Sequence, residues 1–83
     1  MKTFYVYVLK NKEGKIYIGQ TDDLARRVEE HNDPDGHGYT SKYQPWVLVY
    51  QEELTSRQKA MGREKYLKTG VGREWIRNTV LRA

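Results

Sequence analysis

The amino-terminal end of the chain has the pattern of a β-hairpin. The run from Phe4 to Leu9 is aromatic or β-branched apart from its final leucine, and Lys15 to Gly19 forms a second such run. Between them, Asn11-Lys12-Glu13-Gly14 has the composition of a tight turn. A pair of antiparallel strands is therefore predicted to open the fold.

The turn decides which side chains share a face of this hairpin. If Gly14 takes the left-handed position of a three-residue loop, Leu9 faces Tyr17 and Tyr7 faces Gly19, because directly paired residues lie on the same side. A slip of one residue would separate Tyr7 from Tyr17. The predicted register brings both tyrosines and the glycine together.

The rest of the chain has the periodicity of helices and one more strand. The predicted elements are a helix capped by Asp22 and Asp23 and ending near Asn32, an irregular loop from Asp33 to Pro45, a strand from Trp46 to Gln51, a helix opened by the capping box Thr55-Ser56-Arg57-Gln58 and ending near Lys68, and a last helix anchored by Trp75, Ile76, Thr79 and Val80. This order predicts one α+β domain over residues 1–83.

Length and composition exclude several classes of protein. A chain of 83 residues holds one thin core, and the absence of cysteine excludes disulfides and thiolate metal sites. With only two histidines, any metal is expected on oxygen ligands. No run suits a membrane span and no signal-peptide core opens the sequence, so the expected location is the cytoplasm.

The charge is moderately basic. Fifteen Lys and Arg against eleven Asp and Glu give a net charge of +4 and a pI of about 9.4. Positive residues concentrate between Arg57 and Arg82. This pattern suits a polyanionic partner, but a solvated basic helix face explains it equally well.

Glu64 stands out because it falls within an apolar arc. At 100° per residue, it lies between Ala60 and Leu67 on one side and Met61 on the other. An unpaired buried carboxylate costs several kcal/mol, so a cation, hydrogen bonds or the mouth of a groove must accommodate it. Two interpretations stay open: an internal salt bridge to Arg27, or a metal ligand that faces a groove.

Four other residues are candidates for phosphate chemistry. Tyr7 and Tyr17 alone would be ordinary strand tyrosines, but beside Gly19 they face a place where a phosphate backbone has room to approach. Arg27 offers a planar fork suited to phosphate or to a carboxylate. His31, one helical turn later, either transfers protons or caps the helix end.

Together these residues resemble the GIY-YIG nuclease superfamily, and in particular its small stand-alone bacterial proteins. A single triplet occurs often by chance, whereas five elements in this order and spacing are specific. The resemblance covers nearly the whole chain. The matching strings are Tyr5-Val6-Tyr7, Tyr17-Ile18-Gly19, Asp23 to Arg27, His31-Asn32 and Arg63 to Lys68.

The resemblance implies a three-stranded antiparallel sheet flanked by helices, and hydrolysis with one divalent cation, Mg²⁺ or Mn²⁺. By position, Tyr7 and Tyr17 match the motif tyrosines, Gly19 the motif glycine, Arg27 the arginine and Glu64 the metal ligand. Tyr5 replaces the glycine of the first triplet, as in other small members. The expected nucleic-acid contacts are Gly19, Arg63, Lys65, Lys68 and Asn78.

These residue types suit phosphodiester hydrolysis. A cation on Glu64 and the Arg27 guanidinium would stabilise the phosphate, and both would lower the pKa of a phenol toward that of a base. We expect Tyr7 to be the general base and Tyr17 to orient water or phosphate, although the two roles are exchangeable, and His31 joins them as a catalytic candidate.

The predicted function is that of a monomeric DNA endonuclease with structural or weak sequence selectivity. So short a chain has little surface for reading bases. Two other classes stay open. A non-catalytic module with the same fold would bind nucleic acid without cutting it, and a protein-interaction domain would bind no nucleic acid at all.

Overall fold

The computed structural model describes residues 2–82 and has the predicted order of elements. The described elements are β1 (Phe4–Asn11), β2 (Ile16–Thr21), α1 (Leu24–His31), a 3₁₀ turn η1 (Thr40–Tyr43), β3 (Trp46–Leu54), α2 (Arg57–Leu67), α3 (Gly70–Trp75) and a π-helical turn η2 (Ile76–Val80).

The three strands form an antiparallel sheet in the order β2-β1-β3. Tyr7 pairs with Gly19 and Leu9 pairs with Tyr17, which confirms the predicted register. Gly14 has a φ of 87°, the left-handed conformation that the turn requires. The side-chain oxygen of buried Asn11 also accepts hydrogen bonds from the backbone of Lys15 and of Glu13, so the turn is held by side chain as well as backbone.

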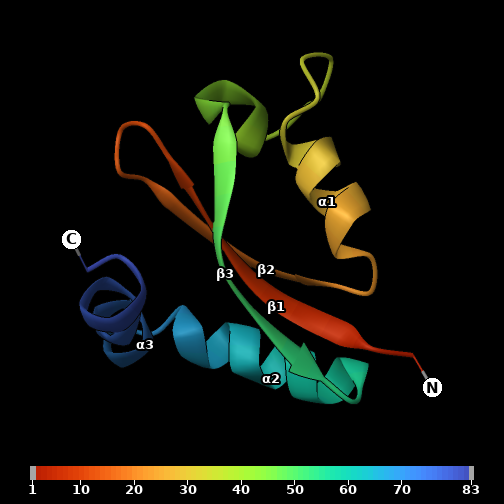
Figure 1. The fold of residues 1–83 in the computed structure, drawn as a ribbon, viewed down its shortest axis with the longest axis vertical. Helices are drawn as coiled ribbons and strands as arrows, with labels where there is room; N and C mark the ends of the chain where they lie inside the picture. Colours follow the sequence, from red (N-terminus) through yellow and green to blue (C-terminus); the bar gives the residue numbers. More distant parts are fainter. Residues whose placement is uncertain (1, 83) are drawn as a thin grey trace.

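Helices cover both faces of the sheet (Figure 1). Alternation along β1 sends Tyr7 and Leu9 toward α1, where they form a core with Trp46. Val6 and Val8 point to the opposite face and pack with residues of α2 and η2, including Leu67 and Ile76. The chain therefore has two thin cores, one on each side of a central strand that is buried over most of its length.

Several boundaries differ from the predicted ones for local reasons. β3 continues to Leu54 because β1 supplies pairing partners up to Phe4. The α2 cap is Ser56, whose hydroxyl accepts from the backbone N–H of Lys59, one residue later than the predicted box. The loop before β3 contains η1, and the chain after Trp75 widens into a π-helical turn.

Among residues 2–82, no helix is both long and apolar enough to cross a membrane.

Candidate active site

Tyr7 and His31 meet in the interior on the α1 side of the sheet. The Tyr7 hydroxyl lies 2.8 Å from Nε2 of His31, although β1 and the end of α1 supply the two side chains. Tyr7 is 1% exposed and His31 is 4% exposed. The aromatic ring of Tyr17 packs beside both, with its centroid 4.7 Å from that of His31. Three of the predicted catalytic side chains therefore form one cluster.

Gly19 makes room for this cluster. A Cβ atom at this position would lie 2.5 Å from the Tyr7 hydroxyl oxygen and 3.1 Å from Cε2 of Tyr17. Any side chain would thus displace a phenol. The two tyrosines, rather than a phosphate backbone, occupy the space that the glycine leaves open.

The other nitrogen of His31 contacts the loop that follows α1. Nδ1 lies 3.0 Å from Oγ1 of Thr40. Burial lowers the pKa of His31 below its ordinary value, and the positive charge of Arg27 lowers it further against an opposing effect of Glu30. The imidazole is therefore neutral at neutral pH, with one nitrogen available as a proton acceptor.

Arg27 and Tyr17 lie where the cluster meets a hollow at the surface. Both line a hollow of about 390 Å³ that is bordered by His31 and by the loop containing Tyr39. Nη1 of Arg27 bonds Oε1 of Glu30 at 2.9 Å, and this pair leaves the guanidinium about two-fifths exposed. The hydrogen bond to Glu30 and the nearby Tyr7 phenol raise the pKa of Arg27, so it stays charged.

Burial is the largest influence on the Tyr7 hydroxyl, and it raises the pKa of Tyr7 to about 12. Arg27 acts in the predicted direction and lowers this pKa, but its effect is smaller than that of burial. Electrostatic interactions with Tyr17 and with the Glu64 carboxylate also oppose ionisation of Tyr7. Tyr7 is therefore a neutral phenol at neutral pH in this structure, and Arg27 alone does not bring its pKa down to that of a base.

Glu64 is half-buried at the edge of the apolar arc of α2. Its neighbours Ala60 and Leu67 are buried, whereas Met61 is exposed. Its carboxylate accepts a hydrogen bond from Nζ of Lys68 at 2.6 Å, so the pairing to Arg27 that the sequence left open is not formed. The Glu64 carboxylate has the smallest of the named effects on the pKa of Tyr7, and Glu64 is not among the residues that line the hollow beside Tyr17 and Arg27.

The structure describes one carboxylate at this position rather than a cluster. Among residues 2–82, no three His, Cys, Asp or Glu side chains gather in a way that would hold a metal ion. A cation that relied on Glu64 would need its remaining ligands from water and substrate. This is the usual manner in which Mg²⁺ binds next to a phosphate.

The four predicted nucleic-acid contacts outside the hairpin differ in their surroundings. Arg63 forms an ion pair with Glu52, from Nη2 to Oε2 at 2.9 Å, and its guanidinium stacks on Trp75. Lys68 is paired with Glu64, as described above. Lys65 on α2 and Asn78 on η2 are exposed. Arg63 and Lys68 therefore have partners within the protein, whereas Lys65 and Asn78 face solvent.

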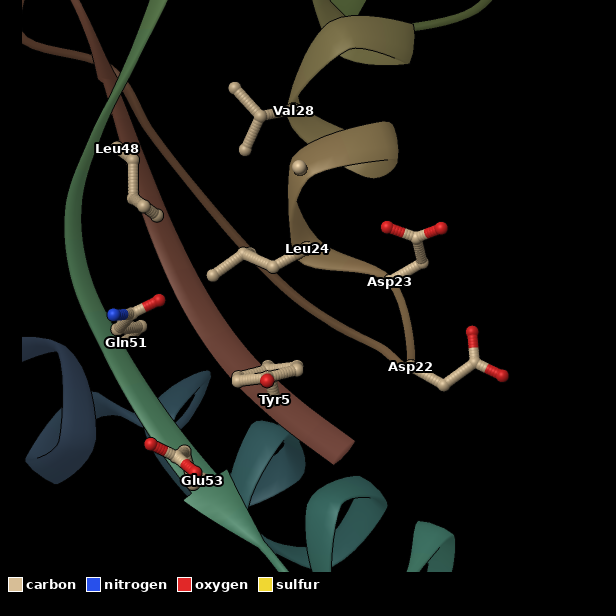
Figure 2. Close-up of a pocket in the computed structure, with 9 residues that line it drawn as sticks. Tyr5, Asp22, Asp23, Leu24, Val28, Leu48, Gln51 and Glu53 are labelled. Carbon is tan, nitrogen blue, oxygen red and sulfur yellow. The ribbon is translucent and has the colours of Figure 1, made fainter. Parts of the chain in front are cut away.

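A second and larger hollow, of about 670 Å³, lies between α1 and the sheet, and its lining does not include Tyr7, Tyr17 or His31. Leu24 and Val28 of α1 face Leu48 across it (Figure 2). Its rim carries the carboxylates of Asp23 and Glu53, which would repel a phosphate backbone. The hollow beside Tyr17 and Arg27 is therefore the better candidate for nucleic acid.

The loop residues that form hydrogen bonds with His31 were not predicted from the sequence. Thr40 contacts its ring, and the Gln44 amide donates to its backbone carbonyl at 3.0 Å. The side chain of Asn32 binds the backbone N–H and carbonyl of Trp46 at 2.6 and 2.9 Å. Asn32 belongs to a motif string, which was a signal of importance. Thr40 and Gln44 lie in an aperiodic loop that gave none.

Known proteins share both the sequence and the fold. The GIY-YIG catalytic domain model matches residues 3–77. A UPF0213 protein of Staphylococcus haemolyticus is 42% identical over 69 residues, which cover 83% of this chain and 84% of the relative.

Two solution NMR structures are also similar. A UPF0213 protein of Bacillus halodurans has a TM-score of 0.56 and 32% identity, over 92% of this chain and 83% of its own. A protein of E. faecalis has a TM-score of 0.61 and 28% identity, over 100% of this chain and 92% of its own. With the two motif tyrosines packed beside Gly19 and a family model that spans most of its length, the chain belongs to the GIY-YIG nuclease family and is related to its small bacterial UPF0213 proteins.

Proposed function

We propose that this chain is a single cytoplasmic nuclease domain that hydrolyses phosphodiester bonds in DNA with the help of Mg²⁺ or Mn²⁺. The observation that carries the proposal is the 2.8 Å contact between the buried hydroxyl of Tyr7 and Nε2 of His31, beside a charged and accessible Arg27. A packing role alone does not require a phenol, an imidazole and a guanidinium in one place. Selectivity for the shape of the DNA is expected, because so small a surface reads few bases.

Glu64 is the residue proposed to hold the cation. It is an oxygen ligand, it is partly exposed, and its only ion-pair partner among the described residues is Lys68, whose flexible side chain is itself about half exposed. When bound there, the cation would neutralise charge on the phosphate and lower the pKa of water. Lys68 would then be released toward the DNA backbone, which accords with its predicted role as a nucleic-acid contact.

Tyr7 is assigned the role of general base because its hydroxyl contacts a proton acceptor, Nε2 of His31. A phenol with a pKa of about 12 is ionised in roughly one molecule in 10⁵ at pH 7, so the phenolate present before the reaction is too rare to account for catalysis. Instead, the Tyr7 oxygen takes a proton from the attacking water while its own proton passes to Nε2 of His31. The hydroxide oxygen bonds to phosphorus as the bond from phosphorus to the leaving sugar oxygen breaks, that oxygen takes a proton from solvent, and His31 becomes an imidazolium.

Tyr17 and Arg27 are assigned to substrate positioning. Both line the hollow beside the cluster, and Tyr17 is only half-buried. The Arg27 guanidinium would exchange its bond with exposed Glu30 for non-bridging phosphate oxygens, which it matches in geometry. The Tyr17 hydroxyl would orient the phosphate or the attacking water.

Cleavage of plasmid DNA and of duplex, branched and single-stranded oligonucleotides, with and without Mg²⁺, tests the proposal. Cutting should require the cation. It should be lost in Glu64→Gln and persist in Glu74→Gln, which alters an exposed carboxylate on α3. Tyr7→Phe should lower the rate by roughly 10²–10⁴-fold.

Two results would contradict this proposal. Cutting that needs no cation, or that survives Glu64→Gln, would remove the assigned metal ligand. Salt-sensitive binding to DNA without cleavage of any of these shapes would instead identify a non-catalytic binding module.

A further inference from the structure

The imidazole of His31 is bonded at both nitrogens. Tyr7 lies at Nε2 and Thr40 at Nδ1, at 2.8 and 3.0 Å. A neutral imidazole has one N–H donor and one acceptor nitrogen, so the identity of its two neighbours determines where its proton resides. His31 is 4% exposed, although it borders the hollow beside Tyr17 and Arg27.

The chemistry of the two hydroxyls favours one arrangement. A phenol is the more acidic donor and the weaker acceptor of the two, since its oxygen shares electrons with the ring, whereas the threonine hydroxyl accepts readily. Tyr7 therefore donates to Nε2 and the Nδ1–H group donates to Oγ1 of Thr40. The opposite arrangement would make the phenol oxygen the acceptor and the alcohol the donor.

We propose that Thr40 is a positioning residue that holds His31 in the Nδ1–H tautomer and so keeps Nε2 available for the Tyr7 proton. The catalytic consequence rests on the nuclease function proposed above, whereas the tautomer itself does not. After proton transfer, Nδ1–H still donates to Thr40, so the ring need not turn during the reaction. No other described residue contacts Nδ1 by a hydrogen bond.

A hydrogen bond to its backbone carbonyl fixes the position of Thr40 within its loop. The indole N–H of Trp46, a residue that is 3% exposed, donates to the Thr40 carbonyl at 2.9 Å. Trp46 is in turn held at its backbone by Asn32, the residue that follows His31. The Thr40 backbone is thus attached to the buried start of β3, and its contact with His31 is not that of a free surface loop.

Imidazole ¹⁵N NMR of the full chain measures the tautomer directly, and exposed His37 provides an internal reference. In the wild type, Nδ1 of His31 should carry the proton. Thr40→Val keeps the shape but removes the acceptor, and should shift the tautomer ratio by roughly tenfold. Thr40→Ser should retain the wild-type tautomer. Ser41→Ala, which removes the neighbouring hydroxyl that donates to the Gly38 carbonyl, should change nothing.

Cleavage rates provide the second readout. Thr40→Val should cut DNA about 10–100-fold more slowly, and Thr40→Ser should restore most of the rate. A wild-type His31 protonated at Nε2 would overturn the proposal without any variant. So would an unchanged tautomer in Thr40→Val, even if its rate fell, because the loss would then be structural.

The outcomes also separate this inference from the nuclease function. If the wild type cuts no substrate, the proposed activity fails, yet the ¹⁵N spectrum still shows whether Thr40 sets the tautomer. If Thr40→Val does not fold, Thr40→Ala and the wild-type spectrum decide the same question.

Discussion

Replacement of Gly19 by alanine should disrupt the tyrosine cluster. The backbone at Gly19 does not have the positive φ that favours glycine, so alanine introduces no backbone strain. Its methyl group would instead lie 2.5 Å from the hydroxyl oxygen of Tyr7 and 2.7 Å from Cζ. These distances are too short for any non-bonded contact, so the phenol must move, and its contact with His31 is then lost.

The expected loss follows from these two effects. Overpacking a core costs about 1–3 kcal/mol, and leaving buried polar groups without a partner costs about 1–3 kcal/mol more. Gly19→Ala should therefore lower the free energy of unfolding by at least about 2 kcal/mol, or the melting temperature by about 8 °C or more. Urea unfolding followed by tryptophan fluorescence measures the change.

Two comparisons make this result specific. Gly62→Ala changes a glycine in the middle of α2 whose Cβ would meet nothing within 4 Å, and it should stabilise the protein by about 0.5–1 kcal/mol. Tyr7→Phe removes the closest atom, so in the Tyr7→Phe background Gly19→Ala should cost less. Equal stability of Gly19→Ala and the wild type would refute the reasoning, as would an equal cost in both backgrounds.

Three other outcomes are expected. Burial raises the pKa of Tyr7 from about 10 to about 12, so the neutral phenol contributes about 2–3 kcal/mol of folding free energy that is present below pH 10 and lost between pH 10 and 12. Urea denaturation at pH 8 and at pH 11.5 should therefore show a larger drop in the free energy of unfolding for the wild type than for Tyr7→Phe. Equal drops in the two proteins would contradict the burial effect. Arg63→Ala leaves the half-buried Glu52 without its ion pair and should lower the free energy of unfolding by about 1–3 kcal/mol in urea, while an unchanged midpoint would mean that the pair contributes nothing. Asn32→Ala removes both hydrogen bonds to the Trp46 backbone and should speed amide exchange at Trp46, and unaltered exchange would show that the loop is held by other contacts.

Much of the fold was predictable because it follows local rules. Two strand-forming runs with a glycine at the left-handed turn position admit one register that buries the apolar face, and Tyr7 does pair with Gly19. The Asp23 cap and the i, i+4 spacing of apolar Leu24 and Val28 predicted α1. The predicted box began α2 one residue too early, since Thr55 and Ser56 are both capable caps and only the path of the chain selects the second.

The sequence by itself determined which chemical groups are available and that the two tyrosines share a face of the hairpin, because backbone alternation is local. Only the tertiary structure decided that burial outweighs Arg27 in setting the pKa of Tyr7, that Glu64 pairs with Lys68, and that Thr40 contacts His31. These outcomes depend on distances between segments that are remote in the chain. Electrostatic and desolvation energies vary steeply with such distances, and residue order does not specify them.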